Sequence, residues 1–183
     1  MRNLPSRLLL TTVLALCCYP GHLAAAENFW SSIGVRGGLS ADGKDHDLIQ
    51  GDAFAVYQLP WELRSRSGWG VGTQLELSAG VLHGSEKYGF IGSAGPALNL
   101  GRPQFPLALD LGLSVAVLSR DTFGDRDYNG YGQFISHAGV DYRFSRTLGL
   151  GYRFQHMSNA GLNGRHNPGA NMHLFGLSWY FAP

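Results

Sequence analysis

Residues 107–117 read LALDLGLSVAV, and every second side chain in this stretch is a large aliphatic one. Such strict alternation is typical of a β-strand with one apolar face and one face of different character. The second face carries only small side chains and one acid: Ala108, Asp110, Gly112, Ser114 and Ala116. The apolar face is long enough to cross a membrane, because a tilted transmembrane strand needs about 9–11 residues.

The same alternation recurs along the chain and predicts eight strands. They cover residues 32–40, 51–59, 70–83, 88–100, 107–117 and 134–144, and the two flanks of a hairpin between Leu148 and Phe181. The stretch 51–59 has the weakest pattern, because Phe54 and Val56 interrupt its polar face.

The less apolar faces of these strands distinguish two all-β architectures. A soluble β-sandwich would carry Lys, Glu and Thr on its wet faces. Here those faces are largely Gly, Ser, Ala and Gln, with single charges at Arg36, Glu76, Asp110, Asp141, Arg143 and Arg153. Small residues and a few opposite charges fit the lumen of a narrow barrel. We therefore expect an all-β, eight-stranded antiparallel transmembrane β-barrel of the outer-membrane type, with the soluble sandwich as the alternative.

Residues 1–26 have the features of a cleaved signal peptide: Arg2 and Arg7, an apolar run from Leu8 to Cys18, and small residues before Glu27. Residues 27–183 then form a single barrel domain, exported and placed in the outer membrane. Both cysteines lie in the signal, which excludes disulfides and zinc–thiolate sites from the mature chain. Loss of two arginines with the signal leaves twelve basic residues against 13 acidic ones, with no basic stripe for nucleic acid.

The last hairpin carries the candidate chemistry. In the strand that begins at Leu148, His156 and Ser158 follow Tyr152 and Phe154 on the apolar face. Residues two apart lie about 6.6 Å apart on the same side of a strand, so rotamers can bring a serine hydroxyl to an imidazole base. If the apolar face contacts membrane, this pair faces lipid, and its substrate is a lipid ester.

The returning strand supplies a partner for the other imidazole nitrogen. With the hairpin centred near residues 163–164, Asn171 falls opposite His156 on the lipid side, and His173 is a weaker option. An even strand count with periplasmic termini places four connections outside the cell: 41–47, 84–87, 120–132 and 159–170. The connection 120–132 carries the charges Asp121, Asp125, Arg126 and Asp127. They indicate a solvated loop, with a bridge to cations or lipid phosphates as the alternative.

The motif His156-Met-Ser158-Asn159-Ala160-Gly161-Leu162, followed by Asn167-Pro168-Gly169, resembles the signature of the lipid A 3-O-deacylase (PagL) family. The resemblance implies an eight-stranded outer-membrane barrel that hydrolyses the ester at position 3 of lipid A. It implies His156 as the base and Ser158 as the nucleophile. It also implies that Asn167 and the backbone N–H of Gly161 form an oxyanion hole.

Asn159 belongs to the motif, with a role in shaping the turn. One position departs from the family pattern, because Asn171 stands where the family has Glu. An amide can accept the imidazole N–H, but it cannot stabilise an imidazolium as a carboxylate does.

Two other functions stay open at this point. One is a non-enzymatic small barrel for adhesion or membrane integrity, with its functional residues in 120–132. The other is an esterase that acts on phospholipid. Ester hydrolysis by this mechanism needs no metal or organic cofactor, although divalent cations bound to lipid phosphates could assist. The expected partners are lipid A or lipopolysaccharide and outer-membrane lipid, while the oligomeric state, a homodimer included, is open.

Overall fold

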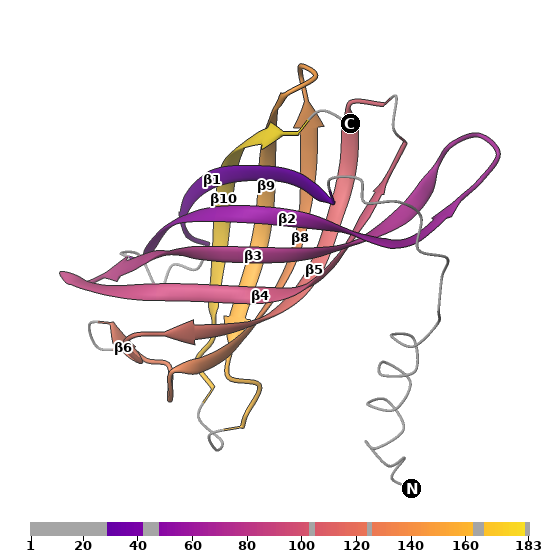
Figure 1. Cartoon of the computed structure of the whole chain (residues 1–183). Coiled ribbons are helices and arrows are strands. Elements are labelled where there is room, and N and C mark those ends of the chain that lie inside the picture. Colours follow the sequence, from indigo (N-terminus) through magenta and orange to yellow (C-terminus); the bar gives the residue numbers. More distant parts are fainter. Residues whose placement is uncertain (1–28, 42–47, 103–104, 124–125, 163–166, 182–183) are drawn as a thin grey trace, which may run out of the picture.

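The computed structural model describes residues 29–41, 48–102, 105–123, 126–162 and 167–181. Their long strands close into one antiparallel barrel, in the order β1-β10-β9-β8-β5-β4-β3-β2 (Figure 1). The strands are β1 (Trp30–Ser40), β2 (Ile49–Arg64), β3 (Gly70–Gly84), β4 (Lys87–Gly101), β5 (Leu107–Leu118), β8 (Gly132–Arg143), β9 (Leu148–Ser158) and β10 (Ala170–Tyr180). This confirms the eight-stranded barrel and excludes the sandwich. The predicted signal peptide, residues 1–26, lies outside the described residues.

The outer wall of the barrel is apolar. On β5, the alternate residues from Leu107 to Val117 are all exposed, and Val117 is 63% exposed. Asp110 and Ser114 on the same strand are buried in the lumen. This distribution reverses that of a soluble protein and matches a wall that contacts lipid. The described residues contain no helix that is long and apolar enough to cross a membrane.

The lumen holds a network of buried ion pairs, as the sequence predicted. Arg36 donates to Asp52 at 2.7 Å and to Glu76 at 2.8 Å. Arg153 donates to both carboxylate oxygens of Glu76, and to Asp110 at 3.0 Å. Because the carboxylates are paired with guanidinium groups, the cost of burying their charges in the lumen is offset.

Strand β2 differs from its prediction. It extends beyond 51–59 at both ends, and its register with β3 shifts between Gln58 and Glu62, around Pro60. The Phe54 ring lies under the Arg36 guanidinium, 4.9 Å from its centroid. A Cβ at Gly34 would lie 2.4 Å from this ring, so the glycine provides the space that the ring occupies. Phe54 therefore interrupts the polar pattern of β2 where its register partner Gly34 leaves room in the lumen.

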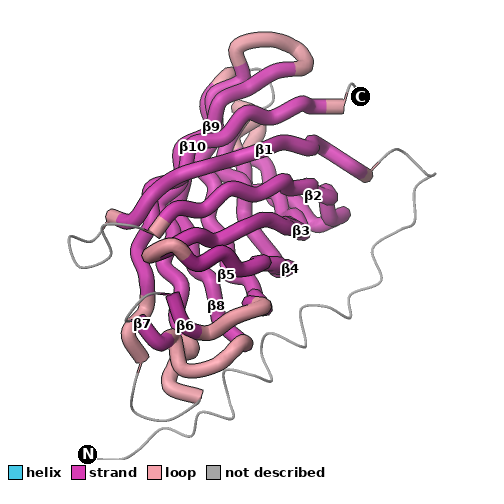
Figure 2. The backbone as a smooth tube through the Cα atoms, turned by 90° about the vertical axis from the view of Figure 1, so that its left-hand side faces the viewer, coloured by secondary structure: helices cyan, strands magenta, loops and turns pink. Residues whose placement is uncertain are grey.

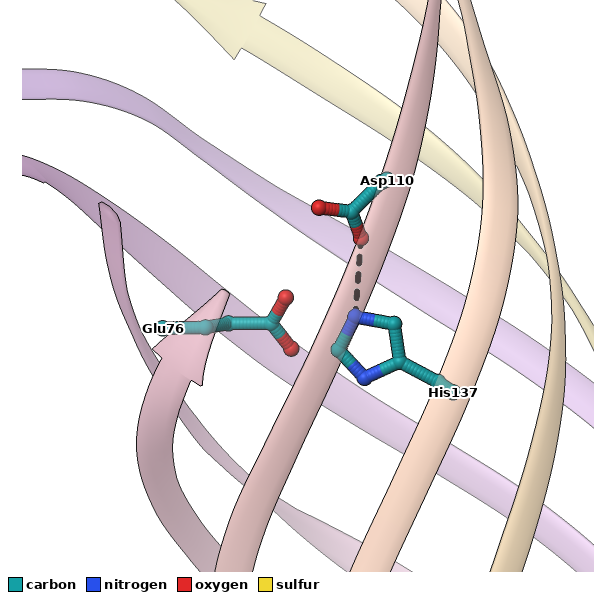
Figure 3. A group of neighbouring side chains, drawn as sticks. All are labelled: Glu76, Asp110 and His137. Atoms are coloured by element: carbon teal, nitrogen blue, oxygen red, sulfur yellow. Dashed lines mark hydrogen bonds and ion pairs between the residues drawn. The ribbon is translucent and has the colours of Figure 1, made fainter. Parts of the chain in front are cut away.

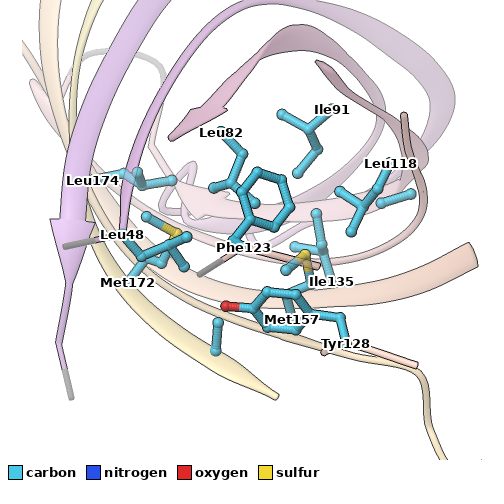
Figure 4. Packing of buried hydrophobic residues seen from close by; sticks show 12 residues of the cluster. Leu48, Leu82, Ile91, Leu118, Phe123, Tyr128, Ile135, Met157, Met172 and Leu174 are labelled. Atoms are coloured by element: carbon cyan, nitrogen blue, oxygen red, sulfur yellow. The ribbon is translucent and has the colours of Figure 1, made fainter. Parts of the chain in front are cut away.

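The two ends of the lumen differ. A cavity of about 930 Å³ reaches the end of the barrel where β1 begins and β10 ends, and its lining includes Ser32, Tyr180 and the charged network of Arg36, Glu76, Asp110 and Arg153. The other end is filled by a buried apolar cluster (Figure 4). This cluster contains Leu48, Leu82, Ile91, Ala116, Leu118, Phe123, Tyr128, Ile135, Met157, Ala170, Met172 and Leu174.

Two members of the apolar cluster, Phe123 and Tyr128, come from the connection between β5 and β8. This connection contains a short hairpin of β6 (Thr122–Phe123) and β7 (Arg126–Asp127). The hairpin lies at the same end of the barrel as the connection between β9 and β10, away from the C-terminus (Figures 1 and 2). The filled end of the lumen is therefore the end that carries the candidate site.

Candidate active site

His156 and Ser158 lie on the outer wall of the barrel, near the end of β9. The intervening residues Gln155 and Met157 are each 1% exposed and point into the lumen. His156 is exposed and Ser158 is half-buried. The outward placement expected from the alternation is therefore confirmed.

Asn171 on β10 is the direct register partner of His156. The Nδ1 nitrogen of His156 lies 2.7 Å from Oδ1 of Asn171. Since an amide oxygen can only accept, Nδ1 is the donor, and Nε2 of the neutral ring keeps its lone pair. The neighbouring Ala170 points inward and is 1% exposed. Asn171 thus fixes the tautomer of an imidazole on the membrane-facing surface.

Ser158 completes the pair on the same strand. Its backbone pairs with Phe134 of β8. Within the described residues no hydrogen bond joins the Ser158 hydroxyl to His156, so a side-chain rotation is needed to bring Oγ to Nε2. Catalytic hydrogen bonds in free enzymes often tighten only when substrate is bound.

The turn after Ser158 is organised by Asn159, which is 1% exposed. The N–H of Gly161 donates to Asn159 Oδ1 at 2.8 Å, and the N–H of Leu162 donates to Asn159 O at 3.0 Å. Ala160 and Gly161 both have positive φ angles, 53° and 76°. The side chain of Asn159 thus shapes a tight turn, and the Gly161 N–H expected in the oxyanion hole is bound within that turn.

Asn167, in the part of the β9–β10 connection that leads into β10, is hydrogen-bonded to this turn. Its Oδ1 accepts the backbone N–H of Asn159 at 3.1 Å. This bond fixes the orientation of the amide, whose NH₂ group is the part that could donate to an oxyanion. Asn167 itself is exposed.

Gly169 lies against the imidazole of His156. A Cβ at this glycine would be 3.1 Å from Cε1 of the ring and 3.7 Å from Nε2. The φ angle of Gly169 is 56°, a backbone conformation that residues with a side chain rarely adopt. The absence of a side chain therefore lets the β9–β10 connection pass close to the base.

The connection between β5 and β8 was interpreted from sequence as a solvated loop. It instead contacts the connection between β9 and β10. Tyr128 is 1% exposed, and its carbonyl accepts the side-chain NH₂ of Asn159 at 3.2 Å. The Arg126 guanidinium donates to Pro168 O and Gly169 O, both at 2.8 Å. The solvated-loop interpretation was wrong for Arg126 and Tyr128. The only sequence signal was the presence of Phe123 and Tyr128 among the charges.

Two other histidines take no part in the pair. His173 was the weaker candidate for orienting His156, but its Nδ1 lies 2.8 Å from the hydroxyl of Tyr152. His137 is in the lumen, and its Nε2 lies 2.9 Å from Asp110 (Figure 3).

The ligand atoms of Glu76, Asp110 and His137 lie within 4.8 Å of one another, which is close enough to hold a metal ion. The two carboxylates are bonded to guanidinium groups, however, so their negative charge is already balanced. This cluster belongs to the lumenal ion-pair network, on the other side of the wall from His156.

Comparison with known proteins agrees with this geometry. Residues 49–180 match the family described as lipid A 3-O-deacylase (PagL), which is well over half of the chain. The chain belongs to the lipid A 3-O-deacylase (PagL) family. It is therefore an outer-membrane carboxylic ester hydrolase of the lipid A 3-O-deacylase kind.

One solved structure, that of the outer membrane enzyme PagL, supports the fold. The crystal structure of the outer membrane enzyme PagL superposes with a TM-score of 0.70 at 16% sequence identity, covering 81% of this chain and 98% of that one. The backbone structure of the Yersinia pestis outer membrane protein Ail covers 82% of this chain and 99% of its own, at 8% identity and a TM-score of 0.46. No curated protein matches the sequence.

Proposed function

We propose that this protein is a serine esterase that removes the 3-O-linked acyl chain of lipid A in the outer leaflet. The observation that carries the proposal is the outward-facing pair of His156 and Ser158, with His156 held at Nδ1 by Asn171. Membership of the lipid A 3-O-deacylase family supports the same substrate.

In the proposed mechanism, Ser158 Oγ attacks the carbonyl carbon of the ester while Nε2 of His156 takes the hydroxyl proton. The NH₂ group of Asn167 stabilises the negative charge that develops on the carbonyl oxygen. The Gly161 N–H joins it if it exchanges its bond to Asn159 for one to the substrate. The proton then passes from His156 to the departing sugar oxygen, and the C–O bond breaks.

The second half of the reaction regenerates the enzyme. Water enters from the exposed side of the site, and Nε2 of His156 removes a proton from it. The resulting attack on the acyl-enzyme releases the fatty acid and returns the proton to Ser158. Asn171 holds the same tautomer through both halves, because its oxygen accepts the hydrogen bond from the Nδ1–H group in each.

The depth of the site supports a membrane lipid as substrate. His156 and Ser158 lie at the last residues of β9, where the barrel wall passes from its apolar surface to the connecting loops. In a lipid, acyl esters lie between the chains and the polar headgroup. An even number of strands places both termini at the other end of the barrel, and we expect the termini on the periplasmic side. We therefore infer that the end with His156 and Ser158 faces out of the cell.

Hydrolysis of phospholipid is the alternative that the geometry accommodates, because any ester at this depth could reach the pair. The test uses purified protein in mixed vesicles of lipid A and glycerophospholipid, with analysis of the released fatty acids. The proposal predicts loss of the acyl chain from position 3 of lipid A and intact phospholipid. Release from phospholipid alone would contradict it, and no release from either would favour a non-enzymatic barrel.

A further inference from the structure

Arg126, on the hairpin of β6 and β7, donates hydrogen bonds to the connection between β9 and β10. We propose that Arg126 is a positioning residue of the deacylase, an inference that rests on the proposed function. Its Nη2 donates to both Pro168 O and Gly169 O at 2.8 Å. These two residues lie between Asn167, the proposed oxyanion donor, and Asn171, the partner of the base.

The geometry of this contact explains why a cation is needed. The carbonyl groups of two successive residues converge on one nitrogen, so their partial negative charges lie close together. A positively charged donor offsets this repulsion, and charge-assisted hydrogen bonds are roughly twice as strong as neutral ones. Without Arg126, the Pro168–Gly169 segment would relax by turning at least one carbonyl away.

Such a relaxation would change the surroundings of the His156 imidazole. Gly169 borders the imidazole of His156, where an added Cβ would lie 3.1 Å from Cε1. A peptide rotation at this point changes the contact with the ring and also moves Asn167. Arg126 thus fixes the distance between the base and the oxyanion donor without contact to the substrate.

The support for Arg126 is itself anchored in the barrel. Phe123 is the register partner of Arg126 and is 4% exposed, and Tyr128 is 1% exposed in the apolar cluster. The carbonyl of Tyr128 accepts the NH₂ group of Asn159, in the part of the β9–β10 connection that follows β9. The same hairpin therefore holds both parts of that connection against the filled end of the lumen.

The test compares Arg126→Ala and Arg126→Lys with the matched pair Arg120→Ala and Arg120→Lys. Arg120 lies in the same connection but makes no hydrogen bond or ion pair within the described part of the chain. The measurements are kcat and KM on lipid A in detergent micelles, with heat-modifiable gel mobility as the measure of a folded barrel. A third measurement is the rate at which a fluorophosphonate labels Ser158, which needs the base and the oxyanion donor but no lipid A.

We expect Arg126→Ala to lower kcat by about 10- to 100-fold with KM within about threefold, because small misplacements of catalytic groups cost up to about 100-fold. Labelling of Ser158 should slow by a similar factor, and the barrel should stay folded. Arg126→Lys should fall between Ala and wild type, since an ammonium keeps the charge but lacks the planar fork. Both Arg120 variants should match wild type, and added guanidinium should restore part of the Arg126→Ala rate.

Several results would overturn the proposal. The first is an Arg126→Ala enzyme whose kcat and Ser158 labelling rate are within twofold of wild type. The second is a loss of kcat in Arg120→Ala equal to that in Arg126→Ala. The third is an Arg126→Ala protein that loses activity only because it does not fold, while Arg126→Lys keeps full kcat. Failure of the proposed function gives a different pattern. In that case wild type leaves lipid A intact, or Ser158→Ala remains active, whatever the Arg126 variants do.

Discussion

Asn171 Oδ1 accepts a hydrogen bond from His156 Nδ1, with 2.7 Å between the two atoms, and the two residues are register partners on β10 and β9. The backbone ladder of the hairpin thus places the orienting group directly beside the base. A neutral amide fixes the tautomer of the ring but adds no charge to stabilise the imidazolium that forms during attack. In the proposed mechanism Asn171 therefore acts by orienting the ring of His156.

Replacement of Asn171 separates orientation from charge. Asn171→Glu should maintain or raise kcat/KM on lipid A, because a carboxylate accepts the same N–H and also stabilises imidazolium. Asn171→Leu should lower it by about 100-fold or more, since loss of tautomer control in a related triad costs about 10⁴-fold. His173→Phe is the control, because His173 is hydrogen-bonded to Tyr152 and not to His156. The kcat/KM of this variant should equal that of wild type. A severe loss in Asn171→Glu would show that the third member is wrongly assigned.

The contact between Gly169 and the base gives a second prediction. Gly169→Ala adds a Cβ 3.1 Å from His156 Cε1 at a φ of 56°, so the ring or the backbone has to shift. We expect kcat to fall by about tenfold or more, because the base moves relative to Ser158. Gly132→Ala is the matched control, since a Cβ there has no neighbour within 4 Å. Equal kcat values for the two variants would mean that the approach of Gly169 does not position the base.

The lumenal network gives a third prediction, for stability and not for catalysis. Arg153→Met leaves Glu76 and Asp110 buried with only part of their hydrogen bonds. Breaking a buried ion pair in this way costs about 3–5 kcal/mol of unfolding free energy. Arg143→Met is the control, because Arg143 is exposed and stacks on Tyr180 at 3.7 Å. Urea unfolding of the folded barrel in vesicles measures both variants, and a loss in Arg153→Met no greater than in Arg143→Met would contradict the role of the network.

Local periodicity was sufficient to predict the barrel, the outward face of β9 and the pairing of Asn171 with His156. The barrel and the outward face of β9 follow from which side of a strand a residue occupies, and alternation fixes that side. The pairing of Asn171 with His156 also needed the position of the hairpin centre, near residues 163–164, which sets the register. The sequence did not reveal how the two outer connections hold each other. The bonds from Arg126 to Pro168 O and from Asn159 to Tyr128 O join loops about 30 to 40 residues apart, with no periodic signal. Periodicity also gave no sign of the hydrogen bond from the Gly161 N–H to Asn159 Oδ1. Because of this bond, the Gly161 N–H is not free to donate to an oxyanion in this structure.

The mass of lipid A from cells that express the protein tests the central claim most directly, namely that His156 and Ser158 hydrolyse an acyl ester from the lipid-facing wall. Ser136→Ala is a matched control, because Ser136 is exposed beside His156 on β8 but lies at another register position than Ser158. We predict that wild type and Ser136→Ala yield lipid A lighter by one 3-O-linked acyl chain. Ser158→Ala and His156→Asn should leave lipid A at its full mass while both barrels fold and insert. Lipid A that is still shortened by a folded Ser158→Ala protein would contradict the account.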